Sequence, residues 1–228
     1  MRRALLIILL LTLSVLGAGC GSSSSDSAAT STEATTATDT AAGTDGCTDV
    51  AAPAPRENGS ATAPKERLDP EKTDNLSFKT NCGSFTVTLD LATAPATAAS
   101  LVALAGSGFY DDTIFHRIVP GFVIQGGDPT QSGSGGAGYQ TVDPPPADAG
   151  YTKGVVAMAK TGAEPAGTSG SQFFVVTGAD IGLPAEYAIV GNVTSGIEVV
   201  ERIGKLGDPA TEQPTRPVVI ESVTVEEQ

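Results

Sequence analysis

All seven Phe and four Tyr residues of this 228-residue chain lie between Phe78 and Tyr187, and this distribution limits where a large hydrophobic core can form. Residues 21–49, in contrast, contain only Gly, Ser, Asp, Ala, Thr, Glu and one Cys. Such a segment cannot bury enough apolar area to offset the entropy lost when a chain becomes ordered. We therefore expect one folded domain over residues 70–228 and a disordered tether, rich in Ser, Thr and Ala, over residues 20–69.

The N-terminus has the pattern of an export signal. Two arginines are followed by an apolar run over residues 4–16 and by small residues before Cys20. The run is shorter than the ~20 residues of a membrane-spanning helix, so the pattern predicts a signal peptide over residues 1–19. A Cys after small residues resembles the lipobox of bacterial lipoproteins, although Gly17 stands where that pattern prefers Leu. The resemblance implies lipidation of Cys20; an ordinary signal peptide and an uncleaved anchor are the alternatives.

Charge and cysteine content narrow the functional classes. The chain has 13 basic and 26 acidic residues, and a net charge of −13 disfavours nucleic acid as a partner. One His and three scattered Cys do not provide a His/Cys metal cage. The two cysteines after Cys20 are Cys47 and Cys82. Outside the cytoplasm such a pair favours a disulfide, and two free thiols are the alternative.

Hydrophobic periodicity predicts a mainly β domain. Alternating apolar residues over 76–80 and 85–90, with turn-forming residues between them, indicate a β-hairpin. Helices are expected from Pro95 to a stop at Gly106, and around residues 197–203. Further strands are expected at residues 114–119, 122–125, 155–159, 173–177, 188–190 and 217–225. Many short strands, glycine-rich connections and only two helices favour a closed antiparallel β-barrel.

Two motif-like features do not lead to a function. Residues 133–138 match the G-x-G-x-x-G pattern of dinucleotide-binding loops, but an Asp-Pro pair precedes them and three prolines follow at 144–146. A dinucleotide site requires a strand before the glycines and a helix after them, so we interpret this segment as a surface loop. A Ser-His-Asp hydrolase would have to use the only histidine, His116, and no G-x-S-x-G sequence is present.

Arg117 is the only basic residue between Lys79 and Lys153, and it lies within the apolar run 114–119. Strand alternation would place its guanidinium on the same face as Phe115. Either the side chain reaches the edge of the sheet and pairs with an acidic residue, or it is a functional cation held beside an apolar surface.

Three blocks of sequence, found in order, resemble cyclophilin-type peptidyl-prolyl isomerases. The first is FHRIVPGFVIQGGD at residues 115–128; the second combines GVVAMA at 154–159 with GSQFFVVT at 170–177; the third lies at 183–196. The resemblance spans residues 70–228 and implies a closed, cyclophilin-like β-barrel with two capping helices. It also implies acceleration of the cis–trans isomerisation of X-Pro bonds, with no cofactor and no metal.

The resemblance assigns roles to individual side chains. Arg117 matches the catalytic arginine, which would donate to the carbonyl oxygen of the bound proline, and Phe122 and Gln125 complete the expected catalytic set. The residues that match the substrate-binding groove are His116, Val123, Ala159, Gln172, Phe174, Leu183 and Tyr187.

Three positions depart from the pattern of many eukaryotic members, in which Gly182 would be Trp, Tyr187 would be His and Val123 would be Met. In the family the rim tryptophan contacts the inhibitor cyclosporin A. The resemblance therefore implies ordinary activity and weakened inhibition.

Two functional hypotheses follow. The first is a monomeric isomerase, lipid-anchored on the extracytoplasmic face of a bacterial membrane, that acts on proline-containing polypeptides as they fold. The second is a proline-peptide-binding module that uses the same barrel with little turnover. The presence of both Arg117 and Phe122 favours the enzyme.

Overall fold

The computed structural model of the protein describes residues 45–228. The expected signal peptide over residues 1–19, the lipidation site Cys20 and the part of the expected tether before residue 45 lie outside this range. In the described part of the chain, no helix is both long and apolar enough to cross a bilayer.

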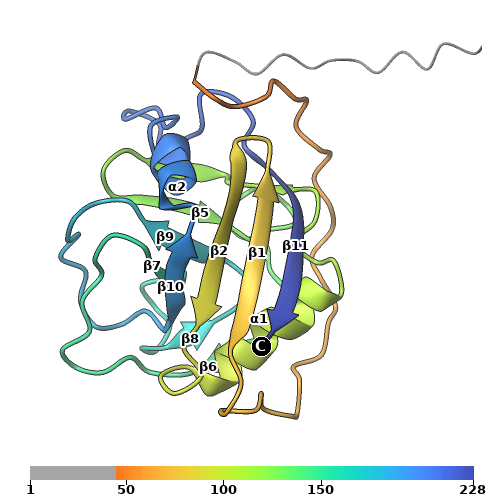
Figure 1. Ribbon diagram of the computed structural model, residues 1–228, viewed down its shortest axis with the longest axis vertical. Helices are drawn as coiled ribbons and strands as arrows, with labels where there is room; N and C mark the ends of the chain where they lie inside the picture. The colour runs from red at the N-terminus through yellow and green to blue at the C-terminus, as the bar shows by residue number, and fades with distance from the viewer. Residues whose placement is uncertain (1–44) are drawn as a thin grey trace, which may run out of the picture. The chain divides into compact units, whose positions relative to one another are not determined.

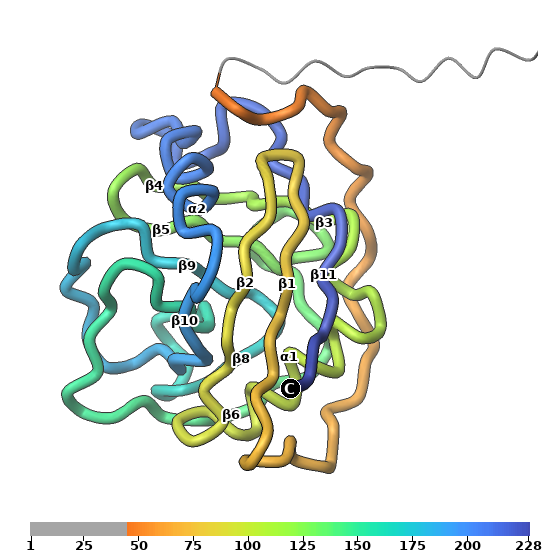
Figure 2. The backbone as a smooth tube through the Cα atoms, in the orientation of Figure 1, coloured from red at the N-terminus to blue at the C-terminus, as the bar shows by residue number. Residues whose placement is uncertain are grey.

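Nine strands form one antiparallel sheet in the order β3-β11-β1-β2-β10-β7-β9-β5-β4 (Figures 1 and 2). Two short strands, β6 and β8, pair separately. The predicted mainly β architecture is confirmed. The strand bounds are β1 (Asp74–Thr80), β2 (Gly83–Leu89), β3 (Thr113–Ile114), β4 (Arg117–Val119), β5 (Val123–Gly126), β6 (Thr141–Val142), β7 (Val155–Met158), β8 (Thr168–Ser169), β9 (Phe173–Val176), β10 (Ile189–Ser195) and β11 (Val219–Glu227).

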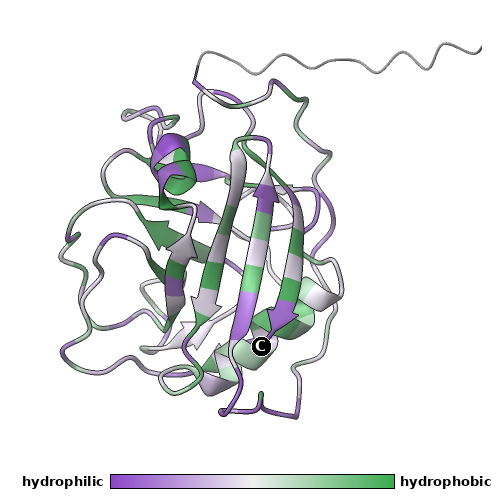
Figure 3. Cartoon of the chain, in the orientation of Figure 1, coloured by the Kyte–Doolittle hydropathy of each residue, from purple (hydrophilic) through white to green (hydrophobic). Residues whose placement is uncertain are grey.

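The hairpin predicted near the start of the domain is formed by β1 and β2. Its register places Phe78 opposite Phe85, and their rings stack with centroids 4.8 Å apart. Both side chains are buried in the main core. Because successive strand residues face opposite sides of a sheet, β1, β2 and β11 show the alternating apolar and polar bands visible in Figure 3.

Two helices cover the sheet, as predicted. α1 (Pro95–Gly106) begins at the expected proline and packs on β11 and β6, and α2 (Ile197–Gly204) packs on β2 and β5. Each helix buries its apolar residues: Leu101 and Leu104 of α1 and Ile203 of α2 are almost inaccessible to solvent. The two helices lie near opposite ends of the strands β1 and β2 (Figure 1).

The expected closure of the barrel is wrong, because within the described chain the outermost strands, β3 and β4, are not hydrogen-bonded to each other. They lie within residues 113–119, where we predicted one strand over residues 114–119. The backbone continues from β3 to β4 without a turn, so the two cannot lie side by side. Instead, the Phe115 amide donates to the Val218 carbonyl at 3.0 Å, and the Ile118 amide donates to the Glu212 carbonyl at 2.8 Å. The result is an open, curled sheet.

Residues 45–64 form an extended segment along the edge of the domain, which we call the strap (orange in Figure 1). The Thr48 amide donates to the Asn81 carbonyl at 2.7 Å, and the Gly59 amide donates to the Gly136 carbonyl at 2.8 Å. The expectation of a disordered tether up to residue 69 is therefore wrong for the strap. Side-chain composition does not predict this order, because the hydrogen bonds named above are made by backbone groups, which every sequence carries.

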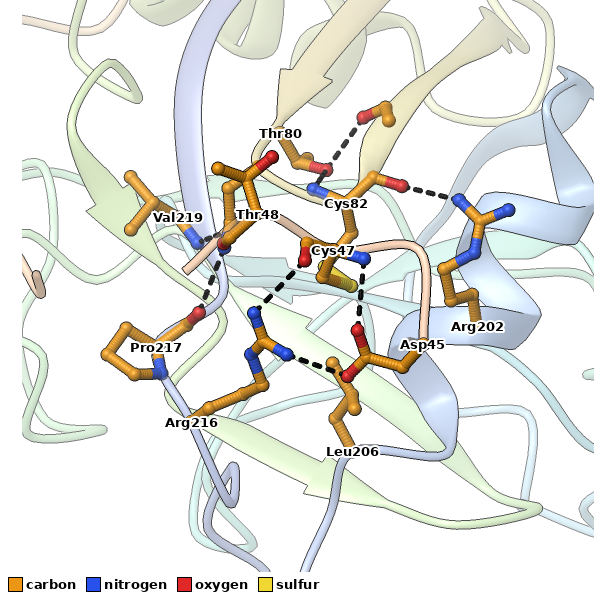
Figure 4. The surroundings of a disulfide bond; sticks show 12 residues. Asp45, Cys47, Thr48, Thr80, Cys82, Arg202, Leu206, Arg216, Pro217 and Val219 are labelled. Atoms are coloured by element: carbon orange, nitrogen blue, oxygen red, sulfur yellow. Dashed lines mark hydrogen bonds and ion pairs between the residues drawn. A yellow bond between two sulfur atoms is a disulfide. The ribbon is translucent and has the colours of Figure 1, made fainter. Parts of the chain in front are cut away.

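A disulfide between Cys47 and Cys82 joins the strap to the turn between β1 and β2 (Figure 4). Both cysteines are fully buried. Two arginines hold this region: Arg216 Nη1 donates to Asp45 Oδ2 at 2.8 Å, and Arg202 Nη1 donates to the Cys82 carbonyl at 2.6 Å. The bridge pairs the two cysteines that the sequence favoured.

Candidate active site

Three polar side chains form a hydrogen-bonded row, which we call the polar row: Arg117 of β4, Gln125 of β5 and Gln172, the residue before β9. Arg117 and Gln125 are direct neighbours in the β4–β5 ladder. Arg117 Nη1 donates to Gln125 Oε1 at 3.3 Å, and Gln125 Nε2 donates to Gln172 Oε1 at 3.0 Å. Gln172 Nε2 then donates to the Gly135 carbonyl at 2.9 Å. The row thus brings together Arg117 and Gln125 of the expected catalytic set and Gln172 of the expected substrate-binding groove.

Glu212 holds the guanidinium of Arg117 from the other side. Its Oε2 accepts a hydrogen bond from Arg117 Nε at 2.7 Å, and the side chains are 46% and 35% exposed, respectively. Arg117 therefore pairs with an acidic residue, as the first of the two sequence-based hypotheses for this side chain stated. Within residues 45–228, Arg117 Nη2 makes no hydrogen bond, so this donor is available to a ligand as the second reading requires.

An apolar patch adjoins the polar row on the face of the sheet opposite the main core. Strand alternation creates it, because Ile124 and Phe173 point into the main core whereas Val123 and Phe174 point to the other face. The rings of Phe174 and Tyr187 meet edge to face with centroids 5.6 Å apart. The patch contains Phe122, Val123, Ala159, Phe174, Leu183 and Tyr187, together with Tyr151, Val155, Ala157, Val176, Ile181 and Ile189.

Tyr187 is fixed in the patch by neighbours that the sequence analysis did not single out. The Tyr151 hydroxyl donates to the Tyr187 carbonyl at 2.8 Å and accepts from its amide at 3.0 Å. Lys160 Nζ lies 5.4 Å from the centroid of the Tyr187 ring and 2.9 Å from Glu186 Oε2. Burial raises the pKa of the Tyr151 hydroxyl, which stays protonated and able to donate.

His116 lies beside the polar row, in the link between β3 and β4. Both ring nitrogens are buried and have no hydrogen-bond partner among the described residues. Burial lowers the pKa of His116, and the Arg117 charge acts in the same direction, while Asp128 opposes them. The imidazole is therefore held neutral. The assignment of His116 to the substrate-binding groove stays a prediction.

A cavity of about 650 Å³ adjoins the polar row, with Gln125 and Gln172 on one side and the loop 133–138 on another. This loop is the G-x-G-x-x-G match. The next element is the short strand β6 rather than a helix, as the interpretation as a loop predicted. No signal in the sequence indicates that the loop forms a wall beside the candidate catalytic residues.

Asp128, which is completely buried, organises this loop. Its carboxylate accepts hydrogen bonds from the amide and hydroxyl of Thr130 and from the amides of Gly133 and Gly135. Burial acts to raise the pKa of Asp128, but these hydrogen bonds outweigh it and hold the pKa below its usual value. A carboxylate just before a glycine-rich run is a turn signal that sequence inspection could have used.

Gly182, next to Leu183 of the patch, leaves the rim open. Its φ is +61°, and a β-carbon built there would meet nothing within 4 Å. The Gly182 amide donates to Asp180 Oδ1 at 3.0 Å, which fixes the local turn. A side chain at this position would therefore extend into open space beside Leu183.

The sequence of residues 75–225 matches the family described as "Cyclophilin type peptidyl-prolyl cis-trans isomerase/CLD". Over 158 residues the chain is 39% identical to peptidyl-prolyl cis-trans isomerase-like 1 of Aspergillus oryzae, covering 67% of this chain and 96% of the relative. It is 38% identical over 174 residues to peptidyl-prolyl cis-trans isomerase A of Mycobacterium tuberculosis, covering 68% of this chain and 94% of the relative.

The fold is similar to that of solved relatives. A crystal structure of a cyclophilin type peptidyl-prolyl cis-trans isomerase from Cryptosporidium parvum superposes with a TM-score of 0.62 at 31% identity, covering 68% of this chain and 98% of the relative. A second structure described by the same protein name was determined in the presence of the dipeptide Ala-Pro, with a TM-score of 0.62. This chain therefore belongs to the cyclophilin-type peptidyl-prolyl cis-trans isomerases.

Proposed function

We propose that this enzyme isomerises X-Pro bonds in polypeptides outside the cytoplasm, with the proline ring on the apolar patch and its carbonyl oxygen at Arg117. The observation that carries this proposal is the position of Arg117, whose unused Nη2 donor lies in a row fixed by Glu212 and Gln125 beside the patch. With this arrangement the apolar patch can contact the pyrrolidine ring of a proline residue while the guanidinium donates to its carbonyl oxygen.

Isomerisation requires only selective binding of a twisted amide. The barrier to rotation about a peptide bond is ~18–20 kcal/mol because resonance gives the bond partial double-bond character. No nucleophile, acid or base is needed, and any interaction that is stronger for the twisted amide than for the planar one increases the rate. Each ~1.4 kcal/mol of such preference corresponds to a tenfold acceleration.

Arg117 and the patch would supply this preference together. As the bond twists, electron density redistributes between the amide nitrogen and the carbonyl oxygen, and a prepositioned guanidinium donor stabilises the changed distribution. The rings of Phe122 and Phe174 would hold the pyrrolidine ring while the preceding residue turns. Gln125 and Gln172 would hold the peptide backbone on either side of the bond.

The location outside the cytoplasm is supported by the sequence around Cys20 and by the Cys47–Cys82 pair. Disulfides persist in oxidising compartments and are rare in the cytosol. A lipidated Cys20 would keep the domain at the membrane, where two acyl chains give stable attachment and a single chain gives only reversible binding. Proline-containing polypeptides that fold after export would be its substrates.

Two measurements test the proposal. NMR exchange spectroscopy on a Xaa-Pro peptide should show catalysed interconversion by the purified protein; binding without faster exchange would favour the proline-peptide-binding module instead. Cell fractionation should place the protein in the membrane fraction, with Cys20→Ser releasing it. Retention of the Cys20→Ser variant in the membrane would contradict the lipid anchor and favour an uncleaved N-terminal helix.

A further inference from the structure

The strap crosses the wall of the active-site cavity, although it lies outside residues 75–225 that match the family. Two of its amides donate to carbonyls of the loop 133–138: Gly59 to Gly136 at 2.8 Å and Ala61 to Ala137 at 2.9 Å. The Arg56 amide donates to the Pro129 carbonyl, just before this loop, at 2.8 Å. Two of these hydrogen bonds reach adjacent residues of the loop 133–138, so the strap is held to this loop by its backbone.

One side chain of the strap adds a further hydrogen bond to this contact. Asn58 Oδ1 accepts a hydrogen bond from the Gly136 amide at 3.0 Å, and Asn58 itself lines the cavity. The two backbones approach so closely that a β-carbon on Gly138 would lie 2.5 Å from the Gly59 carbonyl oxygen. The glycines of the loop and of the strap thus permit an approach that larger residues would block.

The contact continues into the polar row. The loop 133–138 is held by two side chains: Asp128 accepts from the Gly135 amide, and Asn58 of the strap accepts from the Gly136 amide. The Gly135 carbonyl lies between these two hydrogen-bonded amides in the chain. That carbonyl accepts the hydrogen bond from Gln172, which in turn accepts from Gln125. A displacement of the loop would therefore change the positions of the two glutamines.

We propose that the strap is a working part of the active site, in which Asn58 positions the loop 133–138 and, through Gly135, the glutamines that bind the substrate backbone. The proposal rests on the proposed isomerase function, because it concerns the same groove. It makes Asn58 a positioning residue that is specific to chains carrying such a strap. The Cys47–Cys82 bridge and the Asp45–Arg216 ion pair would then keep the strap in place near its start.

Point variants of the full-length protein separate positioning from general stabilisation. Asn58→Ala removes the acceptor for the Gly136 amide, whereas Asn58→Asp keeps an acceptor at the same place. Glu57→Ala is the matched control, because Glu57 is an exposed neighbour on the strap. Gly59→Val is a second perturbation, since its β-carbon would meet the Ala137 carbonyl oxygen at 2.9 Å and push the strap away.

The expected result is a change in substrate binding rather than in turnover. Loss of one neutral hydrogen bond predicts a roughly threefold to tenfold higher KM for a Xaa-Pro peptide in Asn58→Ala, with kcat and the melting temperature nearly unchanged. Amide hydrogen exchange at Gly136 should become faster by a similar factor. Asn58→Asp should restore KM, Gly59→Val should raise it, and Glu57→Ala should have no effect.

Two outcomes would overturn the proposal. One is unchanged hydrogen exchange at Gly136 in both Asn58→Ala and Gly59→Val, which would show that the strap does not hold the loop. The other is faster exchange with an unchanged KM, which would show that the loop does not position the glutamines. Lack of isomerase activity in the unmodified protein would instead contradict the proposed function, while the exchange data would still report on the strap.

Discussion

We expect a large and measurable loss of stability when both cysteines of the Cys47–Cys82 bridge are replaced by serine. The bridge links residues separated by 35 positions, and the loss of chain entropy for a loop of this length corresponds to about 4 kcal/mol of stabilisation. Domains of this kind have total stabilities of ~5–15 kcal/mol. The double variant Cys47→Ser/Cys82→Ser should therefore lose a substantial fraction of the free energy of unfolding, and its melting temperature should fall by about 10 °C.

Urea denaturation followed by far-UV circular dichroism measures this effect. The unmodified protein treated with a reductant is the matched control, because it loses the bridge without a change of sequence and should unfold at the urea concentration of the double variant. Mass spectrometry before and after alkylation establishes the oxidation state of each sample. Two free thiols in the purified, unreduced protein, or a stability difference below about 1 kcal/mol, would refute the reasoning.

Three further predictions concern the site. Glu212→Ala should lower kcat/KM up to about fivefold, because a half-exposed ion pair contributes at most ~1 kcal/mol; no change in a peptide-exchange assay would show that Glu212 does not orient the guanidinium. Because burial lowers the pKa of His116, the neutral side chain contributes to stability above the ordinary His pKa of ~6.5, and this contribution is lost as the pH falls. The urea midpoint of His116→Gln should therefore fall less between pH 7 and pH 5 than that of the unmodified protein. Equal falls in the two proteins would contradict this. Gly182→Trp should increase inhibition by cyclosporin A. It should also lower the free energy of unfolding by about 1 kcal/mol, because φ at this position is +61°. Tight inhibition of the unmodified protein in the same titration would contradict the predicted role of Gly182.

Local sequence signals were sufficient for the elements that depend on nearby residues. The β1–β2 hairpin follows from two alternating runs around a turn, and α1 begins at Pro95 because proline has the φ of a first helical residue and lacks only an unneeded N–H. The resemblance located the polar row and the patch, whose members the structure brings together. Their catalytic and binding roles stay predictions.

The parts that sequence reasoning missed depend on contacts between distant segments. Nothing near Glu212 indicates that it would reach Arg117, from which it is separated by 95 positions. The strap has the composition of a disordered segment, yet its backbone donates hydrogen bonds to the loop at Gly136 and Ala137. The predicted strand over residues 114–119 is divided because its backbone amides pair with the C-terminal segment at Val218, a choice set by tertiary structure.

The central claim, that Arg117 stabilises the twisted X-Pro bond, is tested most directly by comparing catalysis with affinity in Arg117→Ala. NMR exchange spectroscopy gives the catalysed rate on a Xaa-Pro peptide, and a titration under the same conditions gives Kd. Lys72→Ala is the control, because it removes an exposed cation that pairs with Glu227 at 2.7 Å. For Arg117→Ala we expect kcat to fall by roughly a hundredfold or more and Kd to change less than about threefold, while Lys72→Ala leaves both unchanged. An unchanged kcat with a raised Kd would contradict it, because Arg117 would then only bind the substrate.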